Sequence, residues 1–401
     1  MPEARPPHAA PEFEIIRACA RTEVQGDFEQ RSVQLLRPGI DWALLIRLAS
    51  GHQVLPLVYQ SLRHLPAEAV PAEVLGELQQ HSNAVLRSNL SLLTKLFQVL
   101  QLLADADIPC IPYKGPSLAV LAYGGNFGLR PFGDLDILVP AHAYEKTRDL
   151  FRAHGYREGA DWGWESSMVD PTDGVAVDIH RAITPTGFPV PLDFARLHQR
   201  LRGVPVGGRD IKSLCPEDML IILSIQLAKD SWESSPLRLS KVCDVAELLR
   251  SHPDLDWKQI VDETRRLRCE HILAFGLALS EELLDAPSFA PQLREMPRRS
   301  YELLAAHVKD KLLNQMSTDY RRSLSSNRFQ VNIRERPRDK LHPYLWDFAM
   351  VFRPSHLDRE FVHLPRSLKP LYYVVRPIRV LRDLWQRRRN SDGQPRPDPS
   401  E

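Results

Sequence analysis

Asp134-Leu135-Asp136-Ile137-Leu138-Val139, followed by a proline, is the stretch of sequence that decides the fold. Successive side chains of a β-strand point to opposite faces, so Asp134 and Asp136 share one face and three aliphatic residues share the other. Two neighbouring carboxylates repel each other, and a divalent cation relieves that repulsion because Mg²⁺ prefers oxygen ligands. The stretch therefore predicts a strand that packs on a core through one face and holds a metal ion on the other.

A second strand is predicted further along, at Val175-Ala176-Val177-Asp178-Ile179-His180, where apolar residues again alternate with polar ones. If the two strands are neighbours, Asp178 joins the two aspartates, and three carboxylates on one surface are what two-metal phosphoryl chemistry requires. His180 shares the face of Asp178. It could contact a metal, a phosphate or the acceptor, or orient Asp178 by a hydrogen bond, and the sequence leaves these alternatives open.

The segment Lys114-Gly115-Pro116-Ser117 follows a strand predicted at 108–113 and opens a helical run to about residue 123. Its glycine permits close backbone approach, its proline suits a first helical turn, and free amides at a helix start favour a phosphate. The lysine and the serine would add a cation and a hydroxyl. Arg130 could clamp a phosphate with two hydrogen bonds, or form an ordinary salt bridge.

Taken together, these motifs resemble an uncharacterised bacterial nucleotidyltransferase family of the DNA polymerase β-like superfamily. The resemblance rests on Lys114-Gly115, Arg130 and the run from Gly133 to Val139, and Val177-Asp178-Ile179-His180 matches the later Asp-x-His strand of that family. It extends from about residue 41 to about residue 377. One departure is the phosphate turn, which is usually Gly-Ser or Gly-Gly and here is Gly-Pro-Ser.

The resemblance implies that Asp134, Asp136 and Asp178 are catalytic and hold Mg²⁺ or Mn²⁺. It also implies that the nucleoside triphosphate (NTP), ATP among the candidates, binds at a second group of residues: Lys114, Gly115, Ser117, Arg130 and His180. The implied reaction moves a nucleoside monophosphate to a hydroxyl or phosphate of an unknown acceptor, a small molecule or a protein, and releases pyrophosphate.

Two other functions fit parts of the pattern. A glycosyltransferase also uses an Asp-x-Asp motif, but it needs a strand-rich half before the motif, and here about 95 mostly helical residues precede it. A catalytically weak nucleotidyltransferase fold that serves as a binding or scaffold module remains the alternative.

Helical and strand-like periods divide the chain into segments and predict an α+β protein, in which helices flank a small mixed sheet. The predicted segments are a tail (1–11), an N-terminal helical region (12–106), a nucleotidyltransferase core (107–213), a helical domain (214–326), a basic aromatic arm (327–389) and a second tail (390–401). One apolar stripe is expected to pack on the core along the last helix of the N-terminal region. It consists of Leu86, Leu90, Leu93, Phe97, Leu100 and Leu103.

Three further features remain ambiguous in the sequence. Lys229-Asp230 could enter a cleft between sheet and helical domain or simply end a helix, and Asp244 is expected to be solvated or salt-bridged. Residues 366–389 carry eight basic residues and one acid with interleaved aromatics. This part of the arm could contact an anionic surface or a protein partner, or pack back on the body.

Composition sets the remaining limits. The 401 residues carry a formal charge of +1, with 43% hydrophobic and 26% charged residues, which is typical of a globular protein and not of a polybasic or acidic tail protein. The five cysteines are scattered without a C-x-x-C pair, so neither a disulfide framework nor a zinc site is favoured. Residues 1–24 lack an apolar signal segment and no run is long enough to cross a bilayer, which predicts a cytoplasmic protein.

Overall fold

The computed structural model describes residues 11–23, 35–36, 39–185, 188, 190–232, 237–287, 329, 331–341, 344, 361–362, 371–379 and 382. The chain divides into two units, Met1–Glu335 and Arg336–Glu401. The predicted tails lie outside the described residues, apart from Pro11, and so does most of the predicted arm. The boundaries predicted within the first unit stay predictions.

A five-stranded mixed sheet forms the centre of the first unit. Its strands lie in the order β1 (Ile111–Pro112), β2 (Asp134–Leu138), β5 (Ala176–His180), β4 (Glu165–Val169) and β3 (Arg157–Asp161). Only the central pair of this sheet, β2 and β5, is parallel, and the neighbours pair antiparallel. The predicted α+β class with a small mixed sheet flanked by helices is confirmed.

The described helices of the first unit are α1 (Pro11–Cys19), α3 (Trp42–Gly51), α4 (Leu55–Leu62), α5 (Ala72–Asp105), α6 (Pro116–Ala122), α7 (Tyr144–Ala153), α8 (Phe194–Gln199), α9 (Pro216–Trp232), α10 (Leu239–Ser251), α11 (Trp257–Leu267) and α12 (Glu270–Leu284). A 3₁₀ turn, η2 (Ala141–Ala143), precedes α7, and a two-stranded hairpin, β6 (Arg202–Val206) and β7 (Arg209–Ser213), follows α8. In the second unit the short helix α15 spans Pro337–Lys340.

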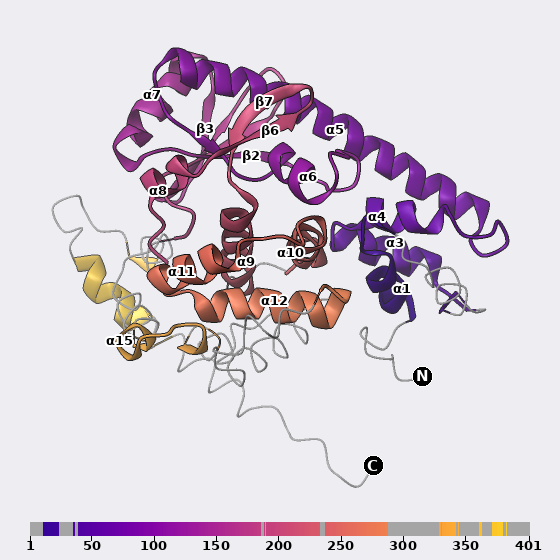
Figure 1. Ribbon diagram of the computed structural model, residues 1–401. Helices are drawn as coiled ribbons and strands as arrows, with labels where there is room; N and C mark the ends of the chain where they lie inside the picture. The colour runs from indigo at the N-terminus through magenta and orange to yellow at the C-terminus, as the bar shows by residue number, and fades with distance from the viewer. Residues whose placement is uncertain are drawn as a thin grey trace, which may run out of the picture. The chain divides into compact units, whose positions relative to one another are not determined.

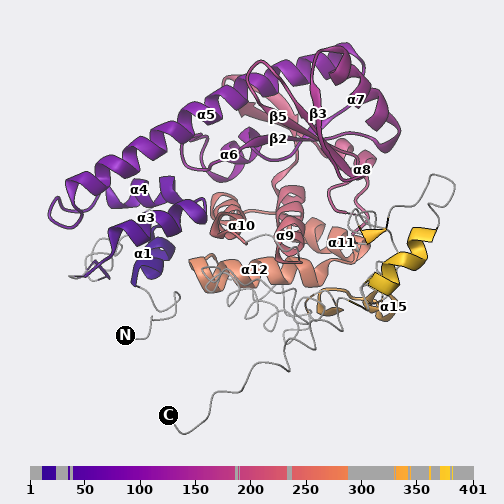
Figure 2. The same ribbon diagram turned by 180° about the vertical axis from the view of Figure 1, so that it is seen from behind.

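Helices cover both faces of the sheet (Figure 1). The helices α5 and α7 lie against the face that carries Leu135, Ile137 and Val139, and their apolar side chains join the same buried cluster. The helices α9 to α12, hereafter the helical layer, lie on the other side of the sheet, and Figure 2 shows the same arrangement from behind. The aliphatic face of β2 is thus buried as predicted, and its polar face is turned toward the helical layer.

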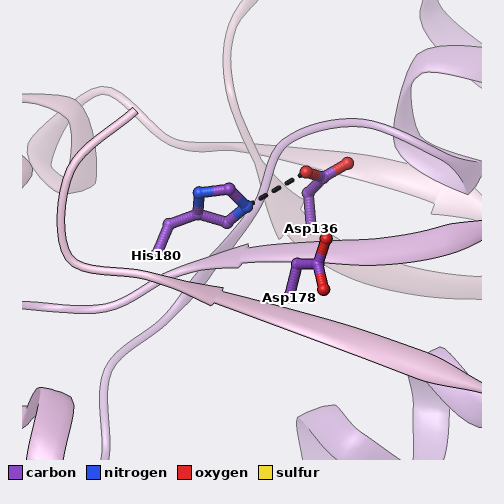
Figure 3. Close-up of side chains that lie close together, drawn as sticks. All are labelled: Asp136, Asp178 and His180. Carbon is purple, nitrogen blue, oxygen red and sulfur yellow. Dashed lines mark hydrogen bonds and ion pairs between the residues drawn. The ribbon is translucent and has the colours of Figure 1, made fainter. Parts of the chain in front are cut away.

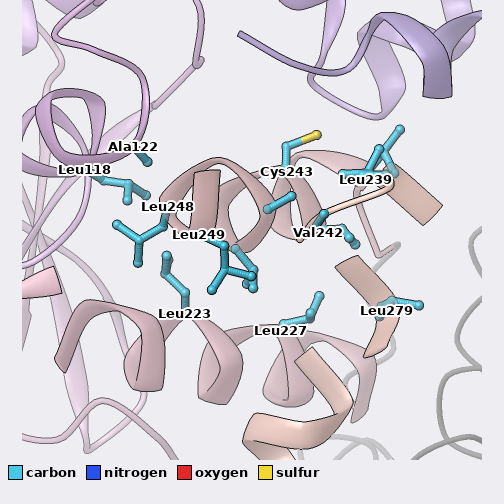
Figure 4. Close-up of a cluster of buried hydrophobic side chains, with 14 of the residues drawn as sticks. Leu118, Ala122, Leu223, Leu227, Leu239, Val242, Cys243, Leu248, Leu249 and Leu279 are labelled. Atoms are coloured by element: carbon cyan, nitrogen blue, oxygen red, sulfur yellow. The ribbon is translucent and has the colours of Figure 1, made fainter. Parts of the chain in front are cut away.

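The larger of the two apolar cores lies within the helical layer and extends into the N-terminal helices α1, α3 and α4. Figure 4 shows its centre, where side chains of α6, α9, α10 and α12 meet. The labelled residues there include Leu118 of α6, Leu223 of α9 and Leu249 of α10, all nearly inaccessible to solvent. One core therefore ties the start of the chain to the helices that face the sheet.

The predicted stripe along α5 is wrong at its beginning. Leu86 and Leu90 are exposed, whereas Leu92, Leu96 and Val99 are buried against the sheet. The later part of the predicted stripe is confirmed, because Leu93 and Leu103 are buried in the same cluster and Phe97 and Leu100 pack against it. Only the second half of α5 lies over the sheet, so its contact with the strands decides which face is buried.

Three strands were not predicted: β3 and the two strands of the hairpin β6–β7. All five residues of β3 are exposed at the edge of the sheet, so no apolar alternation marks this strand. The hairpin β6–β7 did carry a signal, because Gly207-Gly208 joins its strands with φ values of +56° and +80°, and such glycine pairs favour tight hairpin turns. The first predicted strand shortens to Ile111–Pro112, since prolines at 109 and 112 cannot donate to a ladder.

Within the described residues, every helix is too short or too polar to traverse a lipid bilayer.

Close packing of α12 on α9 predicts a destabilised variant. A Cβ at Gly276 would lie 2.8 Å from Ser224 Oγ and 3.1 Å from Ser224 Cβ. We expect Gly276→Ala to lower the free energy of unfolding by about 1–3 kcal/mol, measured by urea denaturation. The matched control is Gly76→Ala in α5, where a Cβ meets nothing within 4 Å. It should raise stability by about 0.5–1 kcal/mol, and equal effects of the two variants would contradict the predicted packing.

Candidate active site

The register of β2 against β5 places two carboxylates side by side. Asp136 pairs with Asp178 across the parallel ladder, and Leu138 pairs with His180. On the next strand Glu165 pairs with His180, so its side chain lies on the same face. Figure 3 shows the carboxylates of Asp136 and Asp178 next to each other, with His180 directed toward Asp136. The predicted convergence of these residues on one surface is therefore observed.

Asp136 is the most strongly engaged of the three aspartates. Its Oδ1 accepts a hydrogen bond from Lys114 Nζ at 2.7 Å and lies 3.1 Å from His180 Nε2. Burial raises the pKa of Asp136, but the charge of Lys114 and the contact with His180 outweigh it and hold the pKa well below its ordinary value. Asp136 therefore stays ionised, and Lys114 has a carboxylate partner.

His180 lies between two carboxylates. Its Nδ1 is 3.2 Å from Glu165 Oε2, on the side opposite to Asp136. Burial raises the pKa of Glu165, while the charges of His180 and Lys229 act against it. Rings of Tyr113 and Trp164 also contact the imidazole, at centroid distances of 5.4 and 5.6 Å. The hydrogen bond at Nε2 and the two aromatic rings orient the imidazole, whereas Nδ1 forms no hydrogen bond among the described residues.

Asp178 and Asp134 differ from Asp136 in their surroundings. Asp178 Oδ1 is buried and has no hydrogen-bond partner in the part of the chain that the structure describes. Burial and the neighbouring charge of Asp136 raise the pKa of Asp134, although Lys114 acts in the opposite direction. A bound cation would lower the free-energy cost of both arrangements. It would give the buried oxygen of Asp178 a partner and would offset the repulsion between Asp134 and Asp136.

A metal ion fits the donor set of this face. One ligand atom from each of Asp136, Asp178 and His180 lies within 4.8 Å of the others. Asp134 does not belong to this close group, although it lies two residues before Asp136 on the same face. Two carboxylates and an imidazole form a mixed oxygen and nitrogen set, which accommodates Mg²⁺, Mn²⁺ or another divalent metal.

The predicted turn before α6 has the predicted backbone. Gly115 precedes the helix with φ +55°, a conformation that favours glycine, and Pro116 stands in the first turn. Ser117 is fully buried, and its Oγ has no hydrogen-bond partner among the residues described. The turn is thus held next to the carboxylate face through Lys114, which directly precedes it.

Arg130 forms a salt bridge, one of the two roles that the sequence left open. Its Nε and Nη2 donate to the carboxylate of Asp244 on α10 at 2.6 and 2.8 Å, and Tyr123 Oη donates to Asp244 Oδ1 at 2.7 Å. All three residues are buried. The planar fork of Arg130 is bound to a carboxylate of the protein, so the structure does not support the predicted phosphate clamp; Asp244 is salt-bridged, one of its two expected states.

The helical layer brings charged residues close to the site, and for Lys229 and Asp230 the sequence left this position open. Lys229 Nζ lies 5.0 Å from the centre of the Trp164 ring, and Lys241 Nζ lies 3.4 Å from the carboxylate of Asp230. Lys229 and Asp230 end a helix, as the sequence indicated, yet they also face the sheet. For Lys241 the sequence carried no signal, because its position depends on how α10 packs.

Comparison with known proteins matches residues 38–285 to a family described as an uncharacterised nucleotidyltransferase. The chain belongs to this family. The match includes the whole sheet, the helical layer and every residue of the carboxylate face, so the resemblance inferred from the motifs is confirmed at the level of the family.

No curated protein matches the chain. Among solved structures it is similar to an antigenic nucleotidyltransferase-like protein from Paracoccidioides brasiliensis, with 14% sequence identity and a TM-score of 0.26. That similarity covers 49% of this chain and 93% of the other.

The buried contact between Arg130 and Asp244 predicts a large loss of stability when one partner is removed. Arg130→Ala leaves a buried carboxylate without its cation, so we expect the free energy of unfolding in urea to fall by about 3–5 kcal/mol. Arg265→Ala, which breaks the more exposed pair with Glu270, is the control and should cost about 1 kcal/mol or less.

A combined Arg130→Met, Tyr123→Phe and Asp244→Leu variant removes the whole polar group, and we expect it to recover most of the stability lost in Arg130→Ala. A cost below about 1 kcal/mol for Arg130→Ala would contradict a buried, desolvated pair.

Proposed function

We propose that the protein transfers a nucleoside monophosphate from an NTP to a hydroxyl or phosphate of an acceptor and releases pyrophosphate, in a reaction that depends on Mg²⁺ or Mn²⁺. The observation that carries this proposal is the pair Asp136 and Asp178, in register on parallel strands, with one buried oxygen that has no donor among the described residues. Membership of a nucleotidyltransferase family supports the same reaction class.

In this proposal Asp136, Asp178 and Asp134 hold the metal, with His180 beside them. The bound metal supplies stabilisation of the negative charge that develops on the phosphate oxygens. Lys114 keeps Asp136 ionised and in place through its hydrogen bond of 2.7 Å. His180 contacts Asp136 through its Nε2 and lies beside Glu165, so it helps to orient the carboxylate face.

The transfer step joins an acceptor oxygen to the α-phosphorus and breaks the bond from that phosphorus to the bridging oxygen of pyrophosphate. Asp178 is proposed to accept the proton of an acceptor hydroxyl, and pyrophosphate leaves with the electron pair of the broken bond. The catalysis is mainly positioning and charge stabilisation, as in phosphoryl transfer generally.

The turn 114–117 is proposed to lie next to the triphosphate. The support is local: Gly115 brings the backbone close, and the Ser117 hydroxyl is buried without a partner in the described part of the chain. Arg130 is left out of the nucleotide site, because its guanidinium is bound to Asp244.

We also propose a cytoplasmic reaction. All five cysteines are free thiols and four of them are buried, which fits a reducing compartment where NTPs are abundant. The predicted contact of residues 366–389 with an anionic surface or a protein partner falls mostly outside the described residues and stays a prediction.

The test of the proposed function uses Asp178→Asn, which removes a charge without breaking any hydrogen bond of Oδ1. Purified protein is incubated with Mg²⁺, each NTP in turn and a metabolite extract, and masses are compared before and after. We expect the wild type to add a nucleotide mass to an acceptor, and Asp178→Asn to reduce the rate at least about 100-fold, since lost charge stabilisation at a reacting centre has effects of this size.

The control is Asp105→Asn at the exposed end of α5, which should react like the wild type. Equal transfer by Asp178→Asn would contradict the proposed role of the carboxylates. Nucleotide binding by the wild type without any mass addition or pyrophosphate would instead favour a binding or scaffold module.

A further inference from the structure

A tryptophan at the tip of the β3–β4 hairpin is turned toward solvent. Trp162 keeps 67% of its surface exposed, more than any other large apolar side chain in the described part of the chain. The turn that carries it is tight: Gly163 has φ +79°, and its N–H donates to Asp161 Oδ1 at 2.8 Å. A single exposed apolar side chain is common on proteins, so the face on which Trp162 stands decides what it means.

Trp162 stands on the face of the sheet that carries the candidate metal ligands. Asp161 pairs with Ser166 across the β3–β4 ladder. The N–H of Trp162 donates to the backbone oxygen of Glu165 at 3.0 Å, which continues the same register. Paired residues of an antiparallel ladder have side chains on the same face. Since Glu165 in turn pairs with His180 of β5, Trp162 shares the face of His180.

Small side chains separate Trp162 from Asp178 on this face. Ser167 of β4 pairs directly with Asp178. Gly159 of β3 packs on Ser167, where an added Cβ would lie 3.2 Å from Ser167 Cβ. All five residues of β3 are exposed, so this part of the face is open to solvent. Trp162, Gly159 and Ser167 thus form a shallow strip that leads to Asp178, hereafter the open strip.

The chemistry of the open strip suits a carbohydrate. A sugar ring has an apolar C–H face that stacks on an indole, and hydroxyl groups that donate and accept hydrogen bonds. Trp162 supplies the indole, Ser167 supplies a hydroxyl, and the Glu165 side chain beside the strip keeps 19% of its surface exposed. A nucleic-acid acceptor would need a cationic groove, whereas Gly159 and Ser167 carry no charge.

We propose that the open strip binds an oligosaccharide acceptor, with one sugar ring stacked on Trp162 and a hydroxyl of a neighbouring ring at Asp178. The inference rests on the proposed function and names its acceptor class. Two strand spacings separate β3 from β5 by about 10 Å, which exceeds one sugar ring. The oxygen of the sugar hydroxyl forms the bond to the α-phosphorus, its proton goes to Asp178, and pyrophosphate leaves.

A glycan array probes this site apart from the reaction. Labelled wild type is bound in EDTA to printed oligosaccharides of two or more rings, and the strongest glycan is then titrated in solution. We expect Trp162→Ala to weaken its binding by about 10-fold or more, because a stacked aromatic ring is lost, and Trp162→Phe to keep most of it. Ser167→Ala should weaken binding about threefold, because one hydrogen bond is lost.

The matched control is Leu90→Ala, which removes a 44% exposed apolar side chain from α5 and should bind the glycan like the wild type. The inference is overturned if the wild type binds no glycan of the array, or if Trp162→Ala binds within twofold of it. Unchanged binding by Ser167→Ala would overturn the role given to that hydroxyl.

The outcomes separate this site from the reaction. If the wild type binds a glycan through Trp162 but adds no nucleotide to any acceptor, the carbohydrate site stands and the proposed function fails. If a nucleotide is added to an acceptor without a sugar, and Trp162→Ala reacts like the wild type, the function stands and the carbohydrate site fails. Both stand if the glycan is the acceptor and Trp162→Ala raises its KM with little change in kcat.

Discussion

The parallel, in-register pairing of β2 with β5 is the constraint on which the site depends. It places Asp136 directly beside Asp178 on a face that is largely shielded from water. Two like charges about 4 Å apart repel each other by about 4 kcal/mol at the effective dielectric of a protein surface. The pair therefore needs positive charge close by, and the side chains of the protein supply only part of it.

Lys114 supplies a positive charge and His180 a hydrogen bond, and both act on Asp136. Asp178 receives no comparable donor among the residues that the structure describes, and its Oδ1 is buried. Burying a carboxylate oxygen without a hydrogen-bond donor costs free energy unless a cation binds to it. The asymmetry between the two aspartates is thus the structural reason for placing a metal between them, independent of the family to which the chain belongs.

A second constraint joins the sheet to the helical layer. Arg130 stands four residues before Asp134, and its partner Asp244 stands three residues after Lys241 on α10. Asn89 of α5 donates to the backbone oxygens of Phe127 and Arg130 and so holds the same loop from the other side. The distance between the carboxylate face and the lysines of the helical layer is therefore set by a buried ion pair and not by mobile surface side chains.

Much of this arrangement follows from local sequence. The alternation around Asp136 and Asp178 predicts both strands and the face that carries the acids, and Gly115-Pro116 predicts the start of α6. Contacts between distant segments could not be predicted in the same way. Arg130 meets a carboxylate 114 positions away, and the buried face of α5 depends on where the sheet ends beneath it. Lys241 joins the site only because α10 packs on α6 and α9, which no local pattern specifies.

Anomalous diffraction from crystals soaked in Mn²⁺ tests most directly whether the paired carboxylates form a metal site. Mn²⁺ replaces Mg²⁺ at oxygen sites and can be located by its own scattering. The predicted result is a peak within ligand distance of both Asp136 and Asp178 in the wild type, and its loss in Asp178→Asn. A peak that stays in the variant, or Mn²⁺ bound only away from β2 and β5, would contradict a metal centre on this face.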